Sequence, residues 1–141
     1  DMAIGLMLSI SRKMPQADRF VRNNDWVDGP FPLTKKMTGA RLGLVGMGRI
    51  GQGIARRGAH GFGMKVIYHN RSRLDAATEA ECKAHYVSKE ELLKTADHLV
   101  LVLPYSASSH HAIGAAELGL MKPTATLVNI ARGGIVDASH R

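Results

Sequence analysis

The sequence has few of the features that mark several large classes of protein. Cys82 is the single cysteine among 141 residues, so no disulfide can form within the chain. A chain without disulfides is typical of a reducing compartment, and we therefore expect a cytoplasmic protein. No apolar run reaches the roughly 18 residues of a membrane span. Residues 3–8, the longest candidate, lack the flanking pattern of a signal peptide, which predicts a protein with no membrane partner.

Aromatic and acidic residues are also scarce. Aromatic residues make up 5% of the chain, and 12 Asp and Glu face 19 Lys and Arg. Nucleic-acid-binding proteins usually cluster their basic residues and interleave exposed aromatic side chains. Here the basic residues are spread along the chain in short groups, so we predict no nucleic-acid partner. We expect part of the net charge of +7 to serve an anionic small molecule instead.

The hydrophobic content and its pattern predict an α/β fold. Hydrophobic residues account for 45% of the chain, which is typical of one globular domain with a core. From Gly39 onward, short apolar segments alternate with segments of helical periodicity. We predict strands at residues 42–45, 64–68, 99–103 and 125–130, and helices at residues 50–58, 74–82, 90–95 and 115–121. Continuously apolar strands are buried on both faces, which indicates a parallel sheet covered by helices.

The first 38 residues have a different character. Apolar residues recur at helical spacing at Ala3, Leu6, Met7 and Ile10. This spacing predicts an amphipathic helix over residues 2–13. Residues 16–24 can form a second short helix with Phe20 and Val21 facing inward. Glycine and proline then predict a loop over residues 23–38.

A glycine motif follows the first predicted strand. Gly46, Gly48 and Gly51 fit the pattern G-x-G-x-x-G, between a strand and a helix, as a dinucleotide-binding turn requires. The first glycine allows the tight turn, the second lets a pyrophosphate approach the backbone, and the third lets the helix pack closely. The N–H groups of Arg49 and Ile50 would then face the pyrophosphate. The alternative is a glycine-rich turn that binds no ligand.

The end of the second predicted strand indicates which nicotinamide cofactor is preferred. NAD-preferring domains place Asp or Glu roughly 20 residues after the glycines, where it holds the ribose 2′-hydroxyl. This position holds Asn70, followed by Arg71, Ser72 and Arg73. A guanidinium pairs with a 2′-phosphate, and the serine can add a hydrogen bond. We therefore predict NADP(H), with NAD(H) possible, whereas exposed loop charges with no ligand are the alternative for the arginines.

Taken together, these motifs resemble a known family. The sequence is similar to the D-isomer-specific 2-hydroxyacid dehydrogenases in several segments. These are residues 43–51 and 129–137, with residues 103–106 and 109–111 between them. The resemblance is to the glyoxylate, hydroxypyruvate and 2-ketogluconate reductase branch. It implies a Rossmann-like, doubly wound parallel sheet. It also implies that the substrate domain is absent from these residues and that a homodimer forms through the cofactor domain.

The resemblance also implies domain boundaries and residue roles. Residues 1–38 correspond to an interdomain helix and connecting loop, and residues 39–141 to an NAD(P)-binding domain that is truncated at its C-terminal end. The family's pyrophosphate contacts fall on Arg49 and Ile50, and its ribose-binding aspartate falls on Asn70. Its remaining cofactor contacts, which form the adenosine wall and the nicotinamide side, fall on Leu103, Pro104, Ser109, Ile130 and Ala131.

Arg132 matches the family's active-site arginine, which holds the carboxylate and C2 oxygen of a 2-oxo acid. A fixed cation suits this position because negative charge develops on the oxygen during hydride transfer. The family's general-acid histidine and its glutamate partner are expected beyond Arg141. We see no spacing of ligands for a metal site.

The leading hypothesis is therefore an NADPH-dependent reduction of a small 2-oxo acid to the D-2-hydroxy acid. Glyoxylate, hydroxypyruvate and 2-ketogluconate are the candidate substrates. One alternative is a non-catalytic NAD(P)-sensing module that controls a protein partner. A second is another enzyme with a similar cofactor domain, such as formate dehydrogenase, and the lack of an acidic residue at Asn70 counts against its NAD-using members.

Overall fold

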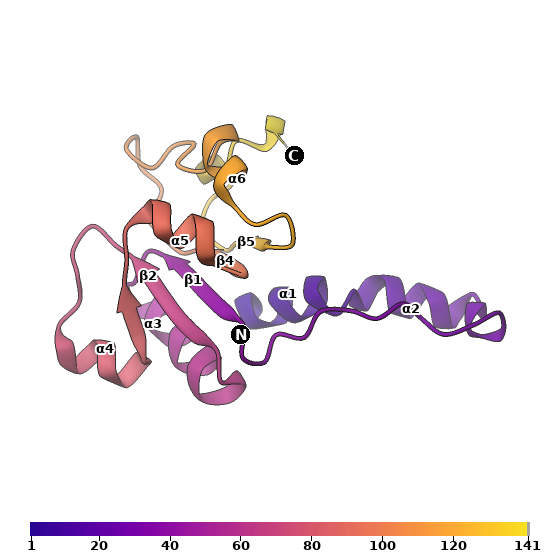
Figure 1. Ribbon diagram of the computed structural model, residues 1–141. Helices are drawn as coiled ribbons and strands as arrows, with labels where there is room; N and C mark the ends of the chain where they lie inside the picture. The colour runs from indigo at the N-terminus through magenta and orange to yellow at the C-terminus, as the bar shows by residue number, and fades with distance from the viewer. Residues whose placement is uncertain (141) are drawn as a thin grey trace.

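A five-stranded parallel sheet forms the centre of the protein in the computed structural model, which describes residues 1–140 (Figure 1). Its strands are β1 (Arg41–Val45), β2 (Lys65–His69), β3 (Ala84–Tyr86), β4 (His98–Leu101) and β5 (Thr126–Asn129). Their order is β3-β2-β1-β4-β5, so the direction of winding reverses between β1 and β4. This confirms the predicted Rossmann-like, doubly wound α/β fold.

Helices cover both faces of this sheet. They are α1 (Met2–Ser11), α2 (Met14–Arg22), α3 (Arg49–Arg56), α4 (Ala76–Cys82), α5 (Lys89–Thr95) and α6 (Ala115–Leu120). One hydrophobic core joins α1, α3 and α4 to one face, and a second joins α5 to the other. The third helix continues into a π-helical segment, Arg57–Gly61. Within residues 1–140, no helix combines the length and the apolar content needed to cross a membrane.

The predicted strands are all present, because each is an apolar run that lies in the core. The structure adds β3, which the sequence pattern does not predict, since it has only three residues and its central His85 is exposed. At the start of α5, the Ser88 side chain accepts a hydrogen bond from the Glu91 N–H at 3.1 Å. Such a cap satisfies a backbone donor at the helix start.

The facing of the first two helices was predicted correctly only in part. The buried residues of α1 are Ala3, Met7 and Ser11, whereas Leu6 is 40% exposed and Ile10 is 50% exposed. No residue of α2 is buried, because this helix projects away from the sheet and has no large surface to pack against (Figure 1). Val21 is therefore 61% exposed. Phe20 is half-buried, and its ring packs edge-on against the Phe31 ring at 5.3 Å.

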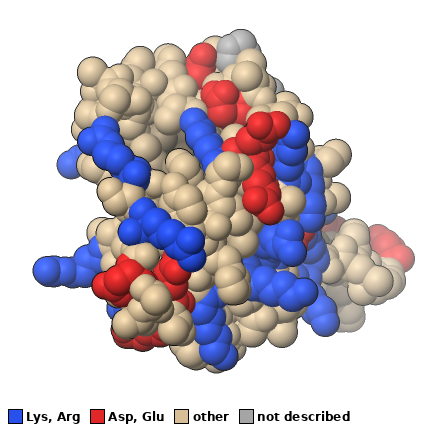
Figure 2. All heavy atoms as spheres, turned by 60° about the vertical axis from the view of Figure 1, so that its left-hand side comes forward, with Lys and Arg blue, Asp and Glu red and all other residues tan. Residues whose placement is uncertain are grey.

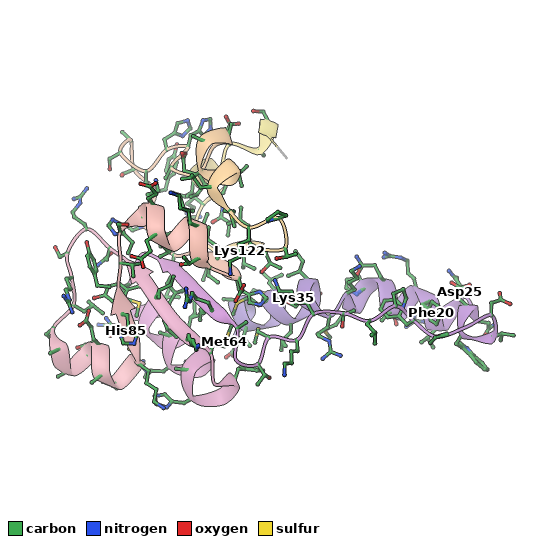
Figure 3. The ribbon with its side chains drawn as sticks, in the orientation of Figure 1. Phe20, Asp25, Lys35, Met64, His85 and Lys122 are labelled. Carbon is green, nitrogen blue, oxygen red and sulfur yellow. The ribbon has the colours of Figure 1, made fainter. Side chains whose placement is uncertain are left out.

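Polar contacts hold the connecting segment against the amino ends of the strands. Lys35 Nζ donates to the Thr124 carbonyl at 2.7 Å, and Lys122 Nζ lies 3.1 Å from Asp97 Oδ1 (Figure 3). The other carboxylate oxygen of Asp97 accepts the Arg41 N–H at 2.8 Å. Partial burial acts to raise the pKa of Asp97, but these hydrogen bonds hold that pKa below its ordinary value.

His98 is a fully buried titratable residue at the start of β4. Its Nδ1 lies 2.7 Å from Thr126 Oγ1 on β5, while Nε2 has no hydrogen-bond partner within the described residues. Burial, and then the positive charge of Lys35, lower the pKa of His98 below its ordinary value. The imidazole is therefore held in its neutral form near neutral pH.

Candidate nucleotide-binding site

The turn after β1 requires glycine at its first motif position. Gly46 has a φ of +98°, a conformation that residues with a side chain rarely adopt. A Cβ at this position would lie 2.9 Å from the Leu103 nitrogen and the Val102 carbonyl carbon. The glycine therefore permits β1 to approach the segment after β4, at the point where the winding of the sheet reverses.

The next two glycines leave the start of α3 open. Gly48 is the N-cap of α3, and a Cβ there would meet no atom within 4 Å. A Cβ at Gly51 would lie 3.0 Å from the Gly46 carbonyl oxygen, so this glycine lets the helix pack onto the turn. No side chain caps the helix, whose first residues, Arg49 and Ile50, are exposed. Open space beside uncapped N–H groups fits a bound pyrophosphate.

A pocket of about 600 Å³ lies beside the glycine turn, at the carboxyl ends of β1 and β2. Six predicted site residues line it, namely Gly46, Asn70, Arg71, Leu103, Pro104 and Ser109. The pocket also has lining residues that the sequence reasoning missed, namely Val45, His69, Lys89, Ser106, Ser108 and Ala112. The missed residues come from four separate segments, and no spacing in the sequence reveals that these segments converge.

The two predicted arginines have different surroundings. Arg71 lines the pocket, whereas Ser72 and Arg73 are not among its lining residues. Arg73 instead holds both carboxylate oxygens of Glu79, each at 3.1 Å. The Arg73 guanidinium, and then the Tyr68 hydroxyl, lower the pKa of Glu79 by their hydrogen bonds to it. Burial, and then the hydrogen bond to Glu79, raise the pKa of Tyr68 to about 12. In this structure Arg71, rather than Arg73, is directed to the pocket.

Basic side chains are dispersed over the surface of the molecule. Figure 2 shows Lys and Arg spread across one face of the molecule, with acidic side chains between them. This matches the dispersed basic residues of the sequence. The pocket itself differs from the surrounding surface, because its ionisable lining residues are His69, Arg71 and Lys89, with no acidic residue among them.

The Ser109 hydroxyl is hydrogen-bonded within the wall of the pocket. Ser109 is only 7% exposed. Its hydroxyl donates to the Pro104 carbonyl at 2.9 Å and accepts the Ser106 N–H at 2.8 Å. These bonds close the loop after β4 on itself, so the loop presents Leu103 and Pro104 to the pocket.

A second pocket, of about 470 Å³, lies at the carboxyl end of β5. Ile50, Ile130 and Ala131 line it together with the start of α1, which brings the predicted nicotinamide-side residues to one place. Arg132 follows directly and is exposed. The Asn129 side chain accepts the Ala131 N–H at 2.9 Å and donates to the Arg132 carbonyl at 3.0 Å. Asn129, which sequence reasoning did not select, thereby fixes the backbone that carries Arg132.

The pocket loop and the Arg132 turn are joined. His111 N–H donates to the Gly134 carbonyl at 2.8 Å, and Ile113 pairs with Val136 in a parallel bridge. The Tyr105 ring packs so closely on Gly134 that a Cβ there would lie 2.6 Å from it. The segment that walls the first pocket and the segment that positions Arg132 therefore form one packed unit.

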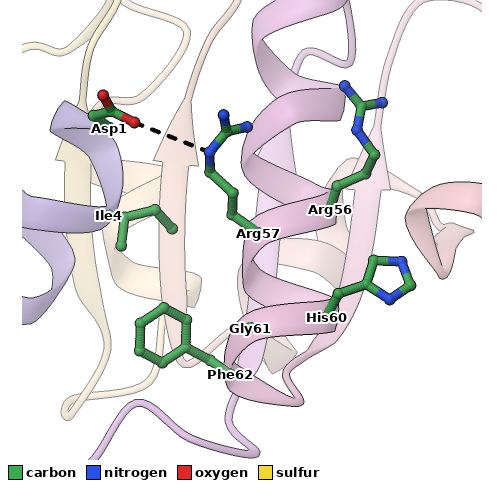
Figure 4. Close-up of a pocket in the computed structure, with 7 residues that line it drawn as sticks. All are labelled: Asp1, Ile4, Arg56, Arg57, His60, Gly61 and Phe62. Carbon is green, nitrogen blue, oxygen red and sulfur yellow. Dashed lines mark ion pairs between the residues drawn. The ribbon is translucent and has the colours of Figure 1, made fainter.

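Another pocket, of about 670 Å³, lies between α1 and the end of α3 (Figure 4). Ile4 and Phe62 give it apolar walls, and Arg57 Nε reaches Asp1 Oδ1 at 4.0 Å. It contains none of the predicted site residues. Among the described residues, no group of three or more His, Cys, Asp or Glu is placed to hold a metal ion.

Four features together define a dinucleotide-binding domain. They are the strand order, the glycine turn, the open start of α3 and the pocket where the winding of the sheet reverses. The family model for the "D-isomer specific 2-hydroxyacid dehydrogenase, NAD binding domain" matches residues 4–140. The chain belongs to this family, and its membership implies a nicotinamide cofactor.

Individual relatives agree with this family. The chain is 45% identical over 145 residues to a glyoxylate reductase from Thermococcus litoralis, covering 99% of this chain and 43% of the relative. The crystal structure of a glyoxylate reductase from Paecilomyes thermophila is 40% identical with a TM-score of 0.88, covering 98% and 41% of the two chains. The holo form of Rhodotorula graminis D-mandelate dehydrogenase is 32% identical with a TM-score of 0.89, covering 99% and 43%. The chain thus spans less than half the length of these relatives.

Proposed function

We propose that the protein carrying this chain reduces a small 2-oxo acid to the D-2-hydroxy acid with NADPH, and that this chain binds the cofactor. The main support for the proposal is that two features lie at the carboxyl ends of the parallel strands. These are a cationic pocket beside the glycine turn and Arg132 beside the second pocket. The glyoxylate reductases among the relatives favour glyoxylate over hydroxypyruvate and 2-ketogluconate as the substrate.

The residues present suit a nicotinamide dinucleotide. In the proposal, the N–H groups of Arg49 and Ile50 hold the pyrophosphate, and the loop from Leu103 to Ser109 walls the adenosine. Ile130 and Ala131 line the nicotinamide side. When bound, the cofactor supplies the hydride that reduces the C2 carbonyl.

Arg132 is proposed to bind the substrate carboxylate and the C2 oxygen. Its planar guanidinium can donate two parallel hydrogen bonds, which suits a carboxylate and an adjacent oxygen. Since negative charge develops on that oxygen, a fixed cation stabilises the transition state more than the ground state. The hydrogen bonds of Asn129 hold the Arg132 backbone in place for this role.

The preference for NADPH is proposed from Arg71, with Asn70 in place of an acidic residue. Titration of nicotinamide fluorescence with the 141-residue chain should show NADPH binding about tenfold more tightly than NADH, which is ~1.4 kcal/mol. Arg71→Asp should abolish this difference, because it replaces a cation with an anion that repels the 2′-phosphate. Arg73→Gln is the matched comparison and should have a smaller effect, since Glu79 already binds that guanidinium. Equal affinities of the unchanged chain for the two cofactors would refute the preference.

The role of Arg132 can be tested by turnover of the whole protein that carries this chain. Arg132→Ala should lower kcat/KM for glyoxylate by about a hundredfold or more, the scale seen when a transition-state donor is removed. NADPH affinity should change little, because Arg132 lies outside the adenosine pocket. A protein that binds NADPH but reduces none of the three 2-oxo acids would instead support the nucleotide-sensing alternative.

Two further parts of the proposal concern assembly and location. We propose a homodimer formed through the cofactor domain together with residues 1–38, where α1, α2 and the segment after them expose apolar side chains. We also propose a cytoplasmic location, for which the buried, unpaired Cys82 is the supporting observation.

A further inference from the structure

We infer that His69 and Lys89 act with Arg71 to recognise the 2′-phosphate of NADPH. The inference rests on the proposed function, because it takes the pocket beside Gly46 to hold the adenosine half of the cofactor. The three residues come from different elements, namely the end of β2, the loop after it and the first turn of α5. All three line this one pocket.

The charge of the pocket favours a phosphate over a hydroxyl. Its ionisable lining residues are two permanent cations and one histidine, and no Asp or Glu is among them. A ribose 2′-hydroxyl gains little from such a wall, whereas a 2′-phosphate with close to two negative charges gains from each cation. Lys89 and His69 thus extend the recognition beyond the arginine that the sequence indicates.

The hydrogen bond of His69 determines which ring nitrogen can serve a ligand. Nδ1 lies 2.9 Å from the Val87 carbonyl oxygen, which can only accept, so Nδ1 carries a proton. Nε2 makes no hydrogen bond to the described residues. In the neutral ring Nε2 is an acceptor and cannot bind a phosphate oxygen, whereas in the protonated ring it is a charged donor. Nε2 is therefore the ring nitrogen that is left to contact a phosphate oxygen, as a donor.

The nearby ionisable groups do not prevent His69 from contacting a phosphate of the ligand. The Tyr86 ring packs against the imidazole at 5.5 Å, and its hydroxyl donates to the Asn70 carbonyl at 3.3 Å. On α4, Glu79 is held by Arg73 and the Tyr68 hydroxyl. On α5, Glu90 is paired with Lys94 at 2.6 Å. These carboxylates have other partners, so they do not occupy His69, and its ring can contact a ligand.

Lys89 is positioned by one of its three donors. Its Nζ donates to the Ala112 carbonyl at 2.9 Å, which ties the start of α5 to the loop that walls the pocket. An ammonium group has three N–H donors, so two remain for a phosphate oxygen. The lysine therefore needs no rearrangement to face an anion in the pocket.

The test compares NADPH and NADH binding to the 141-residue chain by nicotinamide fluorescence. His69→Asn keeps an amide donor for the Val87 carbonyl but removes the second nitrogen. We expect it to weaken NADPH binding about tenfold and to leave NADH binding within about twofold. The 2′-phosphate itself titrates near pH 6, so the variant is always compared with the unchanged chain at the same pH.

Lys89→Gln gives an independent measurement, and it decides the matter if His69→Asn does not fold. It should weaken NADPH binding about tenfold and leave NADH binding within about twofold. Lys65→Gln is the matched control, because it removes the same charge at the opposite end of β2 and should change neither affinity. Adenosine 2′-monophosphate as competitor should report the same losses, since it carries the phosphate without the nicotinamide.

The inference is overturned if both His69→Asn and Lys89→Gln leave the ratio of NADPH to NADH affinity unchanged while the unchanged chain binds NADPH. Failure of the unchanged chain to bind either nucleotide overturns the proposed function, and the inference with it. The two failures are therefore distinguishable in the same titration.

Discussion

At the scale of single residues, two glycines of the same turn are needed for different reasons: Gly46 for folding and Gly48 for ligand binding. Gly46 has a positive φ and no space for a Cβ, so the fold itself demands glycine there. Gly48 has an ordinary φ of −78° and open space around it, so nothing within the described chain demands glycine there. The open position is explained by a ligand that approaches the backbone.

This difference predicts opposite outcomes for two alanine substitutions. Gly46→Ala should lower the free energy of unfolding by about 3 kcal/mol, because it adds backbone strain and a clash with the segment after β4. Gly48→Ala should cost less than about 1 kcal/mol of stability, yet weaken binding of both NADPH and NADH about tenfold or more. Urea unfolding and nucleotide titration of both variants check this. Normal binding by Gly48→Ala would show that the pyrophosphate does not approach this glycine.

At the scale of elements, a buried histidine at the start of β4 makes the stability of the fold depend on pH. His98 is buried between β1 and β5, and its pKa is lowered below the ordinary value of 6.5. In the pH range between the folded and the unfolded pKa, the unfolded chain therefore binds more protons than the folded chain. Stability consequently rises with pH through this range and is lost as the pH falls below about 6.5.

The expected result is a fall in the urea midpoint between about pH 7.5 and about pH 5.5 that depends on His98. His98→Asn should be less stable at neutral pH, because it shortens a buried side chain, but its midpoint should depend less on pH. The exposed His60 gives the matched control, and His60→Asn should keep the pH dependence of the unchanged chain. Asp97 and Glu79 have lowered pKa values, so their contributions are lost only at more acidic pH. A pH dependence that is the same in His98→Asn would contradict this assignment.

At the scale of the whole molecule, the exposed apolar residues are concentrated in the first 33 residues. Trp26, Val27 and Leu33 are 60%, 68% and 99% exposed, and they lie on the part that projects from the sheet or returns from it. A concentration of exposed apolar side chains indicates an interaction surface. This supports the proposed homodimer, in which the projecting part would contact the second copy.

Sedimentation velocity of the 141-residue chain should therefore show a dimer. Trp26→Asp should weaken self-association at least about tenfold, because it buries a charge in place of an aromatic side chain. Leu120→Asp is the control, since Leu120 is exposed on α6 at 38% and lies outside this surface. A monomer at every concentration, or an unchanged dimer in Trp26→Asp, would show that this surface does not mediate dimerisation.

The sequence predicted those features of the fold that depend on local pattern. The core strands are apolar runs because both of their faces are buried, and the glycine turn follows from its spacing. The facing of Leu6, Ile10 and Val21 was wrong, because helical periodicity does not say whether another surface covers a helix. His69, Lys89 and Asn129 were missed for a related reason. Their positions matter only once separate segments meet at the edge of the sheet.

The bridge between Ile113 and Val136 limits where residues can be inserted into this chain. Surface loops usually accept insertions with little cost. The loop after β4 is an exception, since Ser109 closes it internally and its far end pairs with the turn that carries Arg132. An added residue between Pro104 and Ile113 must bulge outward or shift that turn. Among homologous chains, changes of length should therefore fall in the projecting segment around residues 23–33 and spare this loop.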